Sequence, residues 1–548
     1  MNDPQAAIDG SNSRVSIVFD RFLAAWPLHV GLICTVTGLL SVAMGTDEYW
    51  DLRYYHLYAP WAYLHGRYLY DIGPAQSQGF LNPTADFLFY GLISSGLNEW
   101  PRVIAFIMGA VHGINAVLIL AIARHVLRPH RGERAALTAA AFVMGVSGAG
   151  FISLLGTTTN DLINGIFVLG ALLGLLKFAD PGERPAWRAG TWPGLLAGIG
   201  VGLKYTGAIF LPGLALLAAI AAFRRRSAGG LVMFAVAVLA GFLAVAGHHL
   251  LTLWDAFANP VFPWLNQVFR SPYYESDPIR DARFVPQDFW QLVAYPFYWM
   301  TTDTYVVSEP ALREWRGAIA YVATAAALLK FATSRIGRAP RRDRGLAQTR
   351  NLGLVIAFAA VSFVCWELVF GIYRYGVPLE MLTGVIAMGA VIWIFNDRRV
   401  RIGVAIVLTA IAAATTVYPD WGRGEYDDRY VDVRVPPLPA NSIVLIATWQ
   451  PAAYFIPFAE PTAQYIGIEN NYLQLSHDNR LASEVKRLMR APGRRKFVLS
   501  VGEFDGDKLN ALLAQFGRRL DASPCLPIWS NLATAEDEAL SLCPVAGD

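Results

Sequence analysis

Apolar stretches about as long as a membrane-spanning helix alternate with polar segments along most of the chain. A helix needs about 20 consecutive apolar residues to cross the hydrocarbon core of a bilayer. The candidate spans are 22–44, 101–127, 135–155, 160–179, 191–204, 206–222, 229–252, 316–334, 351–372, 376–396 and 400–418. The pattern predicts a polytopic α-helical membrane protein with about 11 spans, two of them short and flanking Lys204.

Arginine and lysine gather in the short loops between these spans, and their distribution predicts the orientation. Cytoplasmic loops carry an excess of both residues. The basic segments are 124–134, 177–188, 224–226, 335–350 and 398–401, and all fall on one side if the N-terminus is inside. We therefore expect a cytoplasmic N-terminus at 1–21, a membrane domain at 22–418 with outer loops at 45–100 and 253–315, and an extracytoplasmic tail at 419–548.

Residues 84–97 are also apolar, but counting them as a span would place the basic segment 124–134 outside. We therefore expect them to form a helix at the outer interface, within the first outer loop. The second outer loop, 253–315, is rich in aromatic residues. Such residues suit sugar stacking or an interfacial lid, and they suit membrane anchoring equally well.

The tail changes from membrane-like to soluble patterning. Strand-like runs at 442–447, 463–468 and 496–501 alternate with helical patterns at 481–490 and 507–516. This alternation predicts a small α/β domain with a partly parallel sheet. Without a glycine-rich phosphate loop or an obvious catalytic set, we expect it to serve structure or acceptor recognition. Cys525 and Cys543 are close enough in sequence for a disulfide if the tail is extracytoplasmic.

Composition agrees with a membrane protein and excludes some other classes. Of the 548 residues, 55% are hydrophobic and 16% are charged, against about 25% charged in soluble domains. The net charge of +3, without a basic run interleaved with aromatics, argues against nucleic-acid binding. The chain has no CxxC or HExxH zinc pattern. The first span lacks a small-residue cleavage pattern, so we expect an anchor and not a cleaved signal peptide.

Three acids follow the first span, at Asp47, Glu48 and Asp51, in the company of Arg53 and His56. An acid at the membrane surface can act as a general base toward an acceptor hydroxyl or amine. It can also bind a divalent metal ion that holds a phosphate. The alternative is that these are ordinary interfacial acids.

Other polar residues are expected to reach the same outer face. Asp161 begins the fourth span and is either a second acid of the site or, with Asn160, a helix N-cap. Lys204 lies between two apolar runs, where a charge is costly and suggests function. It could bind a lipid-linked phosphate, or extend its amine to the lipid head groups.

Arg374 provides a second cation for a phosphate, with Tyr373 and Tyr375 beside it. The alternative is an interfacial anchor. His249 ends the seventh span next to His248 and is a further substrate-binding candidate. A metal pair is conceivable there, but adjacent histidines point apart on a helix, and a local hydrogen bond is the simpler interpretation.

Four stretches in the first part of the chain form an ordered pattern. An acid follows the first span in DLRYYHLYAPWAYLHGR (51–67), and a proline-led helix follows in NPTADFLFYGLISSGLNEWPR (82–102). Asp161 then opens a span, and a lysine lies in AGIGVGLKYTGAIFLPGL (197–214). Together these stretches resemble the GT-C superfamily of membrane glycosyltransferases, which includes the lipid A aminoarabinose transferases and the protein O-mannosyltransferases.

The resemblance implies inverting transfer from a polyprenyl-phosphate sugar to a lipid, glycan or protein acceptor on the outer face of the inner (plasma) membrane. It makes Asp51 the expected base, with Asp47 and Glu48 competing for that role. Lys204 and Arg374 would hold the donor phosphate, and Asp161 would assist. Some members of the superfamily use a divalent metal ion and others do not, so metal dependence stays open.

Three rival functions are consistent with parts of the pattern. A transporter or flippase would place its charges near the bilayer midplane, often in repeated halves, and no repeat is evident. A different cell-envelope polymerase or ligase would rely on arginine and histidine instead of an acid after the first span. A non-enzymatic scaffold would leave Asp51 and Lys204 without a purpose.

Overall fold

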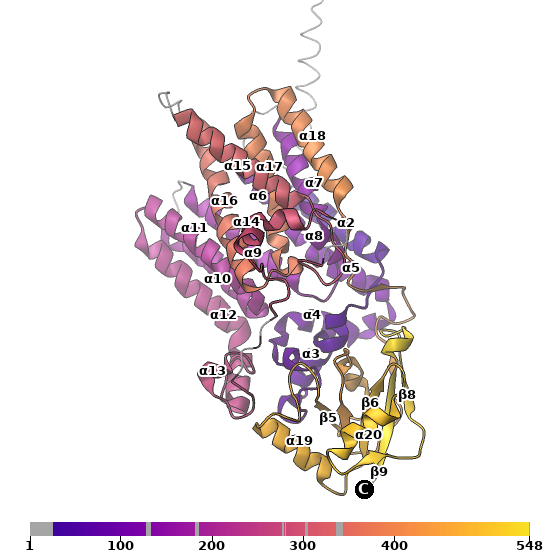
Figure 1. The fold of residues 1–548 in the computed structure, drawn as a ribbon. Helices are drawn as coiled ribbons and strands as arrows, with labels where there is room; N and C mark the ends of the chain where they lie inside the picture. Colours follow the sequence, from indigo (N-terminus) through magenta and orange to yellow (C-terminus); the bar gives the residue numbers. More distant parts are fainter. Residues whose placement is uncertain are drawn as a thin grey trace, which may run out of the picture.

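Long helices form one part of the molecule and a mixed sheet forms the other, in a computed structural model (Figure 1). The structure describes residues 26–127, 133–180, 186–276, 279, 281–301, 305–335 and 344–546. The cytoplasmic N-terminus expected at 1–21 lies outside the described residues. The expected combination of a polytopic helical protein and a C-terminal sheet domain is confirmed.

Each predicted span coincides with helix. The helices are α2 (Trp26–Ala43), α5 (Pro101–His112) continued by α6 (Ile114–Val126), α7 (Arg134–Val146) followed by α8 (Ala149–Ser153), α9 (Asp161–Ala179), α10 (Ala186–Leu203), α11 (Leu211–Arg224), α12 (Ala228–Phe257), α15 (Arg316–Arg335), α16 (Arg344–Val369), α17 (Val377–Ile394) and α18 (Arg398–Thr415). Within the described residues, 7 helical segments are long and apolar enough to cross a membrane. The count of eleven spans therefore stays a prediction.

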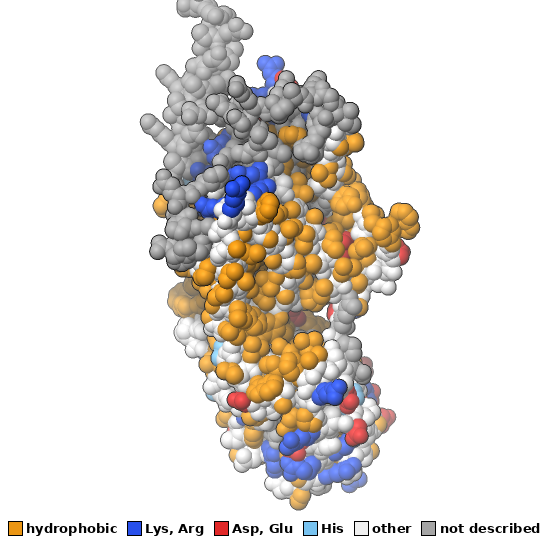
Figure 2. Space-filling model, turned by 90° about the vertical axis from the view of Figure 1, so that its left-hand side faces the viewer, with side chains coloured by type: hydrophobic (Ala, Val, Ile, Leu, Met, Phe, Trp, Pro, Cys, Tyr) orange, Lys and Arg blue, Asp and Glu red, His pale blue; other side chains and the backbone are white. Residues whose placement is uncertain are grey.

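The outer surface of the helical part is apolar. On α12, the side chains of Val232, Val236, Leu239 and Leu251 are each more than half exposed. Figure 2 shows hydrophobic side chains covering this part of the molecule as a continuous band. An apolar surface of this extent is unfavourable in water, so these side chains are suited to face lipid.

The tail folds into a sheet with the strand order β3-β8-β9-β6-β4-β5. Its strands are β3 (Val433–Arg434), β4 (Ile443–Ile446), β5 (Gln464–Gly467), β6 (Lys496–Val501), β8 (Leu526–Ser530) and β9 (Leu540–Ala546), with β7 (Arg519–Leu520) pairing to β9. Strand β4 is parallel to both β5 and β6, whereas β9 is antiparallel to β6 and β8. Helices α19 (Arg480–Arg490) and α20 (Gly506–Ala514) complete the fold. The partly parallel sheet is as predicted, and Cys525 and Cys543 form the disulfide that the sequence left open.

The first outer loop packs against this sheet domain. It contains β1 (Thr46–Asp47), η1 (Leu52–His56), α3 (Tyr58–Leu64), η2 (Arg67–Leu69), η3 (Ser77–Phe80), η4 (Pro83–Asp86), α4 (Phe87–Ile93) and η5 (Gly96–Glu99). Strand β1 pairs with β2 (Arg423–Gly424) just after the last long helix, and Ile72 forms a parallel bridge to Ile466 of β5. A single hydrophobic core includes Leu52 and Phe89 of the loop with Tyr430 of the tail. The loop and the tail therefore form one folded unit.

Candidate active site

Four charged side chains meet where the helical part adjoins the first outer loop. Asp51 precedes η1, Asp161 is the first residue of α9, Lys204 lies between α10 and η6 (Tyr205–Phe210), and Arg374 lies in η7 (Tyr373–Gly376). Nη1 of Arg374 lies 2.8 Å from Oδ2 of Asp51 and 3.7 Å from Oδ2 of Asp161. Nζ of Lys204 lies 2.7 Å from Oδ1 of Asp161.

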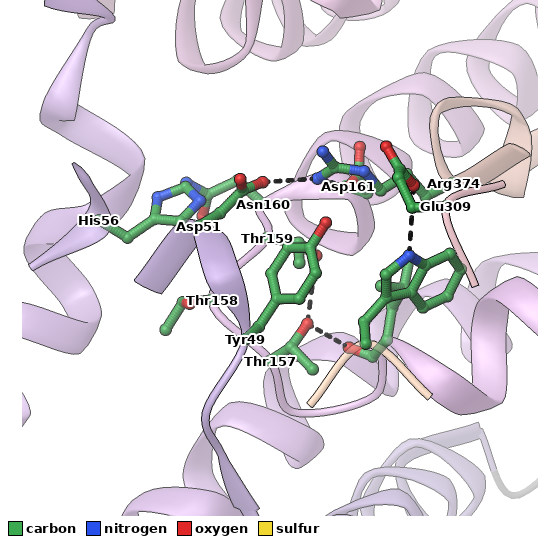
Figure 3. A network of polar contacts seen from close by, with 12 residues as sticks. Tyr49, Asp51, His56, Thr157, Thr158, Thr159, Asn160, Asp161, Glu309 and Arg374 are labelled. Atoms are coloured by element: carbon green, nitrogen blue, oxygen red, sulfur yellow. Dashed lines mark hydrogen bonds and ion pairs between the residues drawn. The ribbon is translucent and has the colours of Figure 1, made fainter. Parts of the chain in front are cut away.

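These four residues, called the charged cluster below, alternate in sign and have no net charge. Their side chains are only 3% to 12% exposed, and Figure 3 shows Asp51 and Arg374 directed toward each other. Separating one such charge from its partner inside a protein is expensive. An anionic ligand that entered the cluster would therefore replace an acid as the partner of a cation.

Aromatic rings hold the two cations in place. The guanidinium of Arg374 lies 5.4 Å from the ring centre of Tyr49 and 5.1 Å from that of Tyr375. The amine of Lys204 lies 5.1 Å from the ring centre of Tyr375 and donates to the backbone oxygen of Thr159 at 2.6 Å. Cation–π contacts of this kind favour the charged form and fix its position.

The ionisation of Asp51 is set by two opposing effects. Burial disfavours the carboxylate, but nearby positive charge, above all that of Arg374, outweighs it and holds the pKa of Asp51 below its ordinary value. Asp51 is therefore ionised at neutral pH. A low pKa also makes it a weak base for as long as Arg374 is its partner.

A histidine and its partners line a small cavity beside the charged cluster. Nδ1 of His56 lies 2.7 Å from Oδ1 of Asp86, and the side-chain amide of Asn160 donates to the same oxygen at 2.5 Å. The cavity, about 80 Å³ in volume, is also lined by Lys204 and Tyr375. Nε2 of His56 is buried and has no hydrogen-bond partner among the described residues. It thus has the capacity for one further hydrogen bond.

The role of Asn160 differs from the helix N-cap that the sequence suggested. Its side chain makes no capping bond to α9, and its backbone is left-handed with φ of 60°, a conformation that asparagine adopts more readily than most residues. This conformation accompanies the bond from its amide to Asp86. Asp86 itself was missed from sequence, because it lies in the stretch expected to form an interfacial helix.

Of the three acids after the first span, only Asp51 belongs to the charged cluster. Asp47 is fully buried and accepts hydrogen bonds from both the backbone N–H and the hydroxyl of Thr158, each at 2.8 Å. It thereby fixes the loop that leads to Asp161. Glu48 is half-buried, and its carboxylate packs against Gly424 of β2. Burial raises the pKa of Glu48.

Comparisons with known proteins identify the fold. Residues 89–283 match the family model described as Glycosyltransferase family 87. The structure is similar to ArnT from Cupriavidus metallidurans bound to undecaprenyl phosphate, with a TM-score of 0.50 and 12% identity, over 95% of this chain and 98% of that chain. The chain has the GT-C fold of membrane glycosyltransferases.

Two weaker structural matches were also found. Apo ArnT from C. metallidurans has a TM-score of 0.41 and 11% identity over 96% of this chain and 98% of that one. The Archaeoglobus fulgidus oligosaccharyltransferase, tethered with an acceptor peptide, has a TM-score of 0.40 and 14% identity over 89% and 70%. The search of curated proteins gave no match. Together, the family match and the GT-C fold support glycosyltransferase activity in a multi-pass membrane protein.

The region that matches the glycosyltransferase family contributes half of the charged cluster. Residues 89–283 include Asp161 and Lys204, whereas Asp51 and Arg374 lie on either side of this region. The other half of the charged cluster therefore comes from the first outer loop, which carries Asp51, and from η7, which carries Arg374.

Three further sequence candidates, like Asp47 and Glu48, lie outside the charged cluster. Arg53 forms two hydrogen bonds with Glu538 of the tail, at 2.5 and 2.8 Å. The hydroxyl of Tyr373 donates to Glu380 at 2.7 Å, and Nε2 of His249 lies 3.0 Å from the backbone oxygen of Phe80. Among the described residues, no group of three or more His, Cys, Asp or Glu side chains is placed to hold a metal ion.

Proposed function

We propose that this chain transfers a sugar from a polyprenyl-phosphate donor to an acceptor on the outer face of the membrane, with Asp51 as the general base. The observation that carries the proposal is the charged cluster, in which the Asp51 carboxylate pairs with Arg374, and Lys204 pairs with Asp161 and lines a cavity. The structure of ArnT, whose fold this chain shares, was solved with undecaprenyl phosphate.

Lys204 and Arg374 are the proposed partners of the donor phosphate. When the bond between the anomeric carbon and the phosphate oxygen breaks, negative charge develops on the phosphate. Both cations lie near the ring of Tyr375, so their positive charge is already in place to stabilise the charge on the phosphate. Asp161 acts as a positioning residue, because it bonds Lys204 directly.

Asp51 becomes a stronger base when the donor binds. The donor phosphate competes for Arg374, whose charge is what most lowers the pKa of Asp51. Once that charge is shared, burial weighs more heavily and the pKa of Asp51 rises. The acceptor oxygen then forms its bond to the anomeric carbon from the face opposite the phosphate, and Asp51 takes the proton of the acceptor hydroxyl.

The arrangement of the whole chain agrees with a site on the outer face. The basic segments 224–226 and 398–401, at the end of α11 and in the first turn of α18, lie at the end of the helical part away from the sheet domain (Figure 1). Basic loops are typical of the cytoplasmic side. The disulfide between Cys525 and Cys543 suits a tail in an oxidising compartment.

The test is transfer of radiolabelled sugars from polyprenyl phosphate in membranes, comparing the wild type with Asp51→Asn. The replacement is nearly isosteric but removes the base, so we expect a loss of about 100-fold or more. Glu48→Gln is the matched control, because it neutralises a neighbouring acid outside the charged cluster, and it should retain activity.

Full activity of Asp51→Asn would rule out Asp51 as the base. If wild-type membranes transferred no sugar from any polyprenyl-phosphate hexose or pentose tried, the transporter or flippase alternative would be favoured instead.

A further inference from the structure

A second and larger cavity lies among the helices on the other side of η7. It is a groove of about 550 Å³ between α14 (Phe289–Tyr298), α15, α16 and α17, and its wall is mostly apolar. Its lining reaches from Arg316, at the start of α15, to Leu328, 12 residues further along that helix. At 1.5 Å per helical residue, the groove therefore extends about 18 Å along α15.

The charged residues of the groove gather at one end. Arg316 begins α15, Glu367 lies in the last turn of α16, and Glu380 lies in the first turn of α17, so all three are at the same end of the helices. The deeper wall is formed by small and apolar residues such as Ala320, Ile356 and Ile386. This distribution fits an amphiphile, with its head at the polar end and its chain between the helices.

Two polar atoms in the residues lining the groove have no partner in the described protein. The Glu367 side chain is 2% exposed, and its Oε1 accepts no hydrogen bond. The indole nitrogen of Trp299, a residue 3% exposed, donates none. Buried polar atoms without partners are costly. A ligand that offered a donor to Glu367 and an acceptor to Trp299 would remove this cost.

The chemistry of these atoms selects among possible head groups. A hydroxyl group can donate to Glu367 and accept from Trp299. An ammonium group has no acceptor for Trp299, and a fully ionised phosphate has no donor for Glu367. The charge of Arg316 is already paired with Glu314. Rings of Trp299, Trp366 and Tyr373 surround this end, as suits a sugar or another neutral polyol.

The groove and the charged cluster share η7 as a common wall. Tyr373 and Gly376 line the groove, whereas Arg374, between them in sequence, bonds Asp51. The polar end of the groove therefore lies across η7 from the pair of Arg374 and Asp51. We propose that this groove binds the acceptor, a lipid with a neutral, hydroxyl-bearing head group, and this inference rests on the proposed function.

The first test measures lipid binding to the purified protein without any donor. Three probes share the same two acyl chains: glucosyl-diacylglycerol, phosphatidic acid and a trimethylammonium lipid. We expect glucosyl-diacylglycerol to bind about 10-fold more tightly than either of the others, and Glu367→Met to lose that advantage without a lower melting temperature. A merely structural Glu367 would instead show destabilisation on replacement.

A blocking variant keeps the test independent of Glu367. Ala360 lines the groove and is exposed, so Ala360→Trp should fill the groove and abolish binding of glucosyl-diacylglycerol. Val236→Trp places the same side chain on the lipid-facing surface of α12 and should bind like the wild type. Equal binding of all three probes, or unchanged binding by Ala360→Trp, would refute the site.

The second test separates an acceptor from a structural lipid. In transfer assays with glucosyl-diacylglycerol, Glu367→Met should raise the KM for this lipid about 10-fold and leave the KM for the polyprenyl-phosphate donor unchanged. A lower kcat with both KM values unchanged would indicate a structural lipid and overturn the acceptor role. Because binding is measured without donor, failure of Asp51 as the base would leave the groove result standing, and the reverse also holds.

Discussion

At the scale of single residues, the pairing of Asp51 with Arg374 connects two requirements of the proposed reaction. A phosphate site needs cations whose existing anionic partner the phosphate can displace. A general base needs a pKa high enough for it to accept a proton. In the structure, an ion pair of 2.8 Å joins the guanidinium of Arg374 to the carboxylate of Asp51. Binding of the donor then changes the partner of Arg374 and the basicity of Asp51 together.

Replacing Arg374 with Met should change the pH dependence of activity. The largest influence that lowers the pKa of Asp51 is then absent, while the burial that raises it remains. Asp51 of the free enzyme should therefore become protonated at higher pH than in the wild type, and the acid limb of the kcat/KM profile should move to higher pH. The measurement is kcat/KM for the donor against pH at saturating acceptor.

Arg429→Met is the control for this experiment, because Arg429 is half exposed and pairs with Glu99 away from the charged cluster. Its profile should match that of the wild type. An acid limb that stayed in place in Arg374→Met would contradict the assigned coupling.

The residues of the charged cluster could be predicted from sequence because of where they lie. Asp51, Asp161, Lys204 and Arg374 each stand at the end of an apolar stretch, where a charge is conspicuous. Asp86 lies near the start of the expected interfacial helix, where an acid is ordinary, and only the fold shows that it is buried against His56. The sequence could not exclude Asp47 as a candidate for the base either, because its hydrogen bonds to Thr158 join residues 111 positions apart.

At the scale of elements, the first outer loop is held to the tail by buried polar contacts as well as by apolar packing. Arg67 bonds both carboxylate oxygens of Asp71, at 2.8 and 3.0 Å, and also donates to the backbone oxygens of Pro461 and Ala463. The bonds to Pro461 and Ala463 tie the turn around η2 to the edge of the sheet near β5. The position of the loop that carries Asp51 therefore depends on contacts with a domain far away in sequence.

Arg67→Met should destabilise the protein by about 3 kcal/mol or more, because Asp71 is left as a buried charge without its partner. Thermal unfolding of the purified protein measures the effect. Arg487→Met removes an exposed arginine that pairs with Glu484 on α19, and it should cost less than about 1 kcal/mol. Similar losses in the two variants would show that the Arg67 contacts contribute little.

The elements that sequence revealed are those with regular local patterns. Strands β4, β5 and β6 and helix α19 were predictable because apolar runs and helical spacing are local signals. Strands β8 and β9 were not, since each contains a proline (Pro527 and Pro544) and β8 also has several exposed side chains. The β1–β2 pair joins two-residue segments that lie close in space but are separated by almost the whole membrane domain in sequence. No local pattern can indicate such a pair.

At the scale of the whole molecule, the helical part has two unlike ends. The sheet domain and the first outer loop cover one end, and basic connections lie at the other (Figure 1). The apolar band between them has no comparable polar covering on the face shown in Figure 2. This arrangement leads to a direct test of the proposed orientation.

Single cysteines placed at the two ends should react differently with a membrane-impermeant maleimide. Asn396→Cys lies in the α17–α18 connection and Glu503→Cys lies in the tail, and both positions are exposed. In sealed right-side-out vesicles, with Cys34 and Cys365 replaced by Ser, only Glu503→Cys should be labelled. Labelling of Asn396→Cys alone would show that the orientation is the opposite of the one proposed.

The union of the first outer loop with the tail also has a consequence for biosynthesis. The backbone N–H of Asp47 bonds the hydroxyl of Tyr430, which follows it by 383 residues. Since a chain is synthesised from its N-terminus, the segment carrying Asp51 leaves the ribosome long before the residues that fix it. The proposed catalytic base can be positioned only after the last helix is inserted and the tail is translocated. An incomplete nascent chain, or one cut short by a premature stop codon, should therefore be inert.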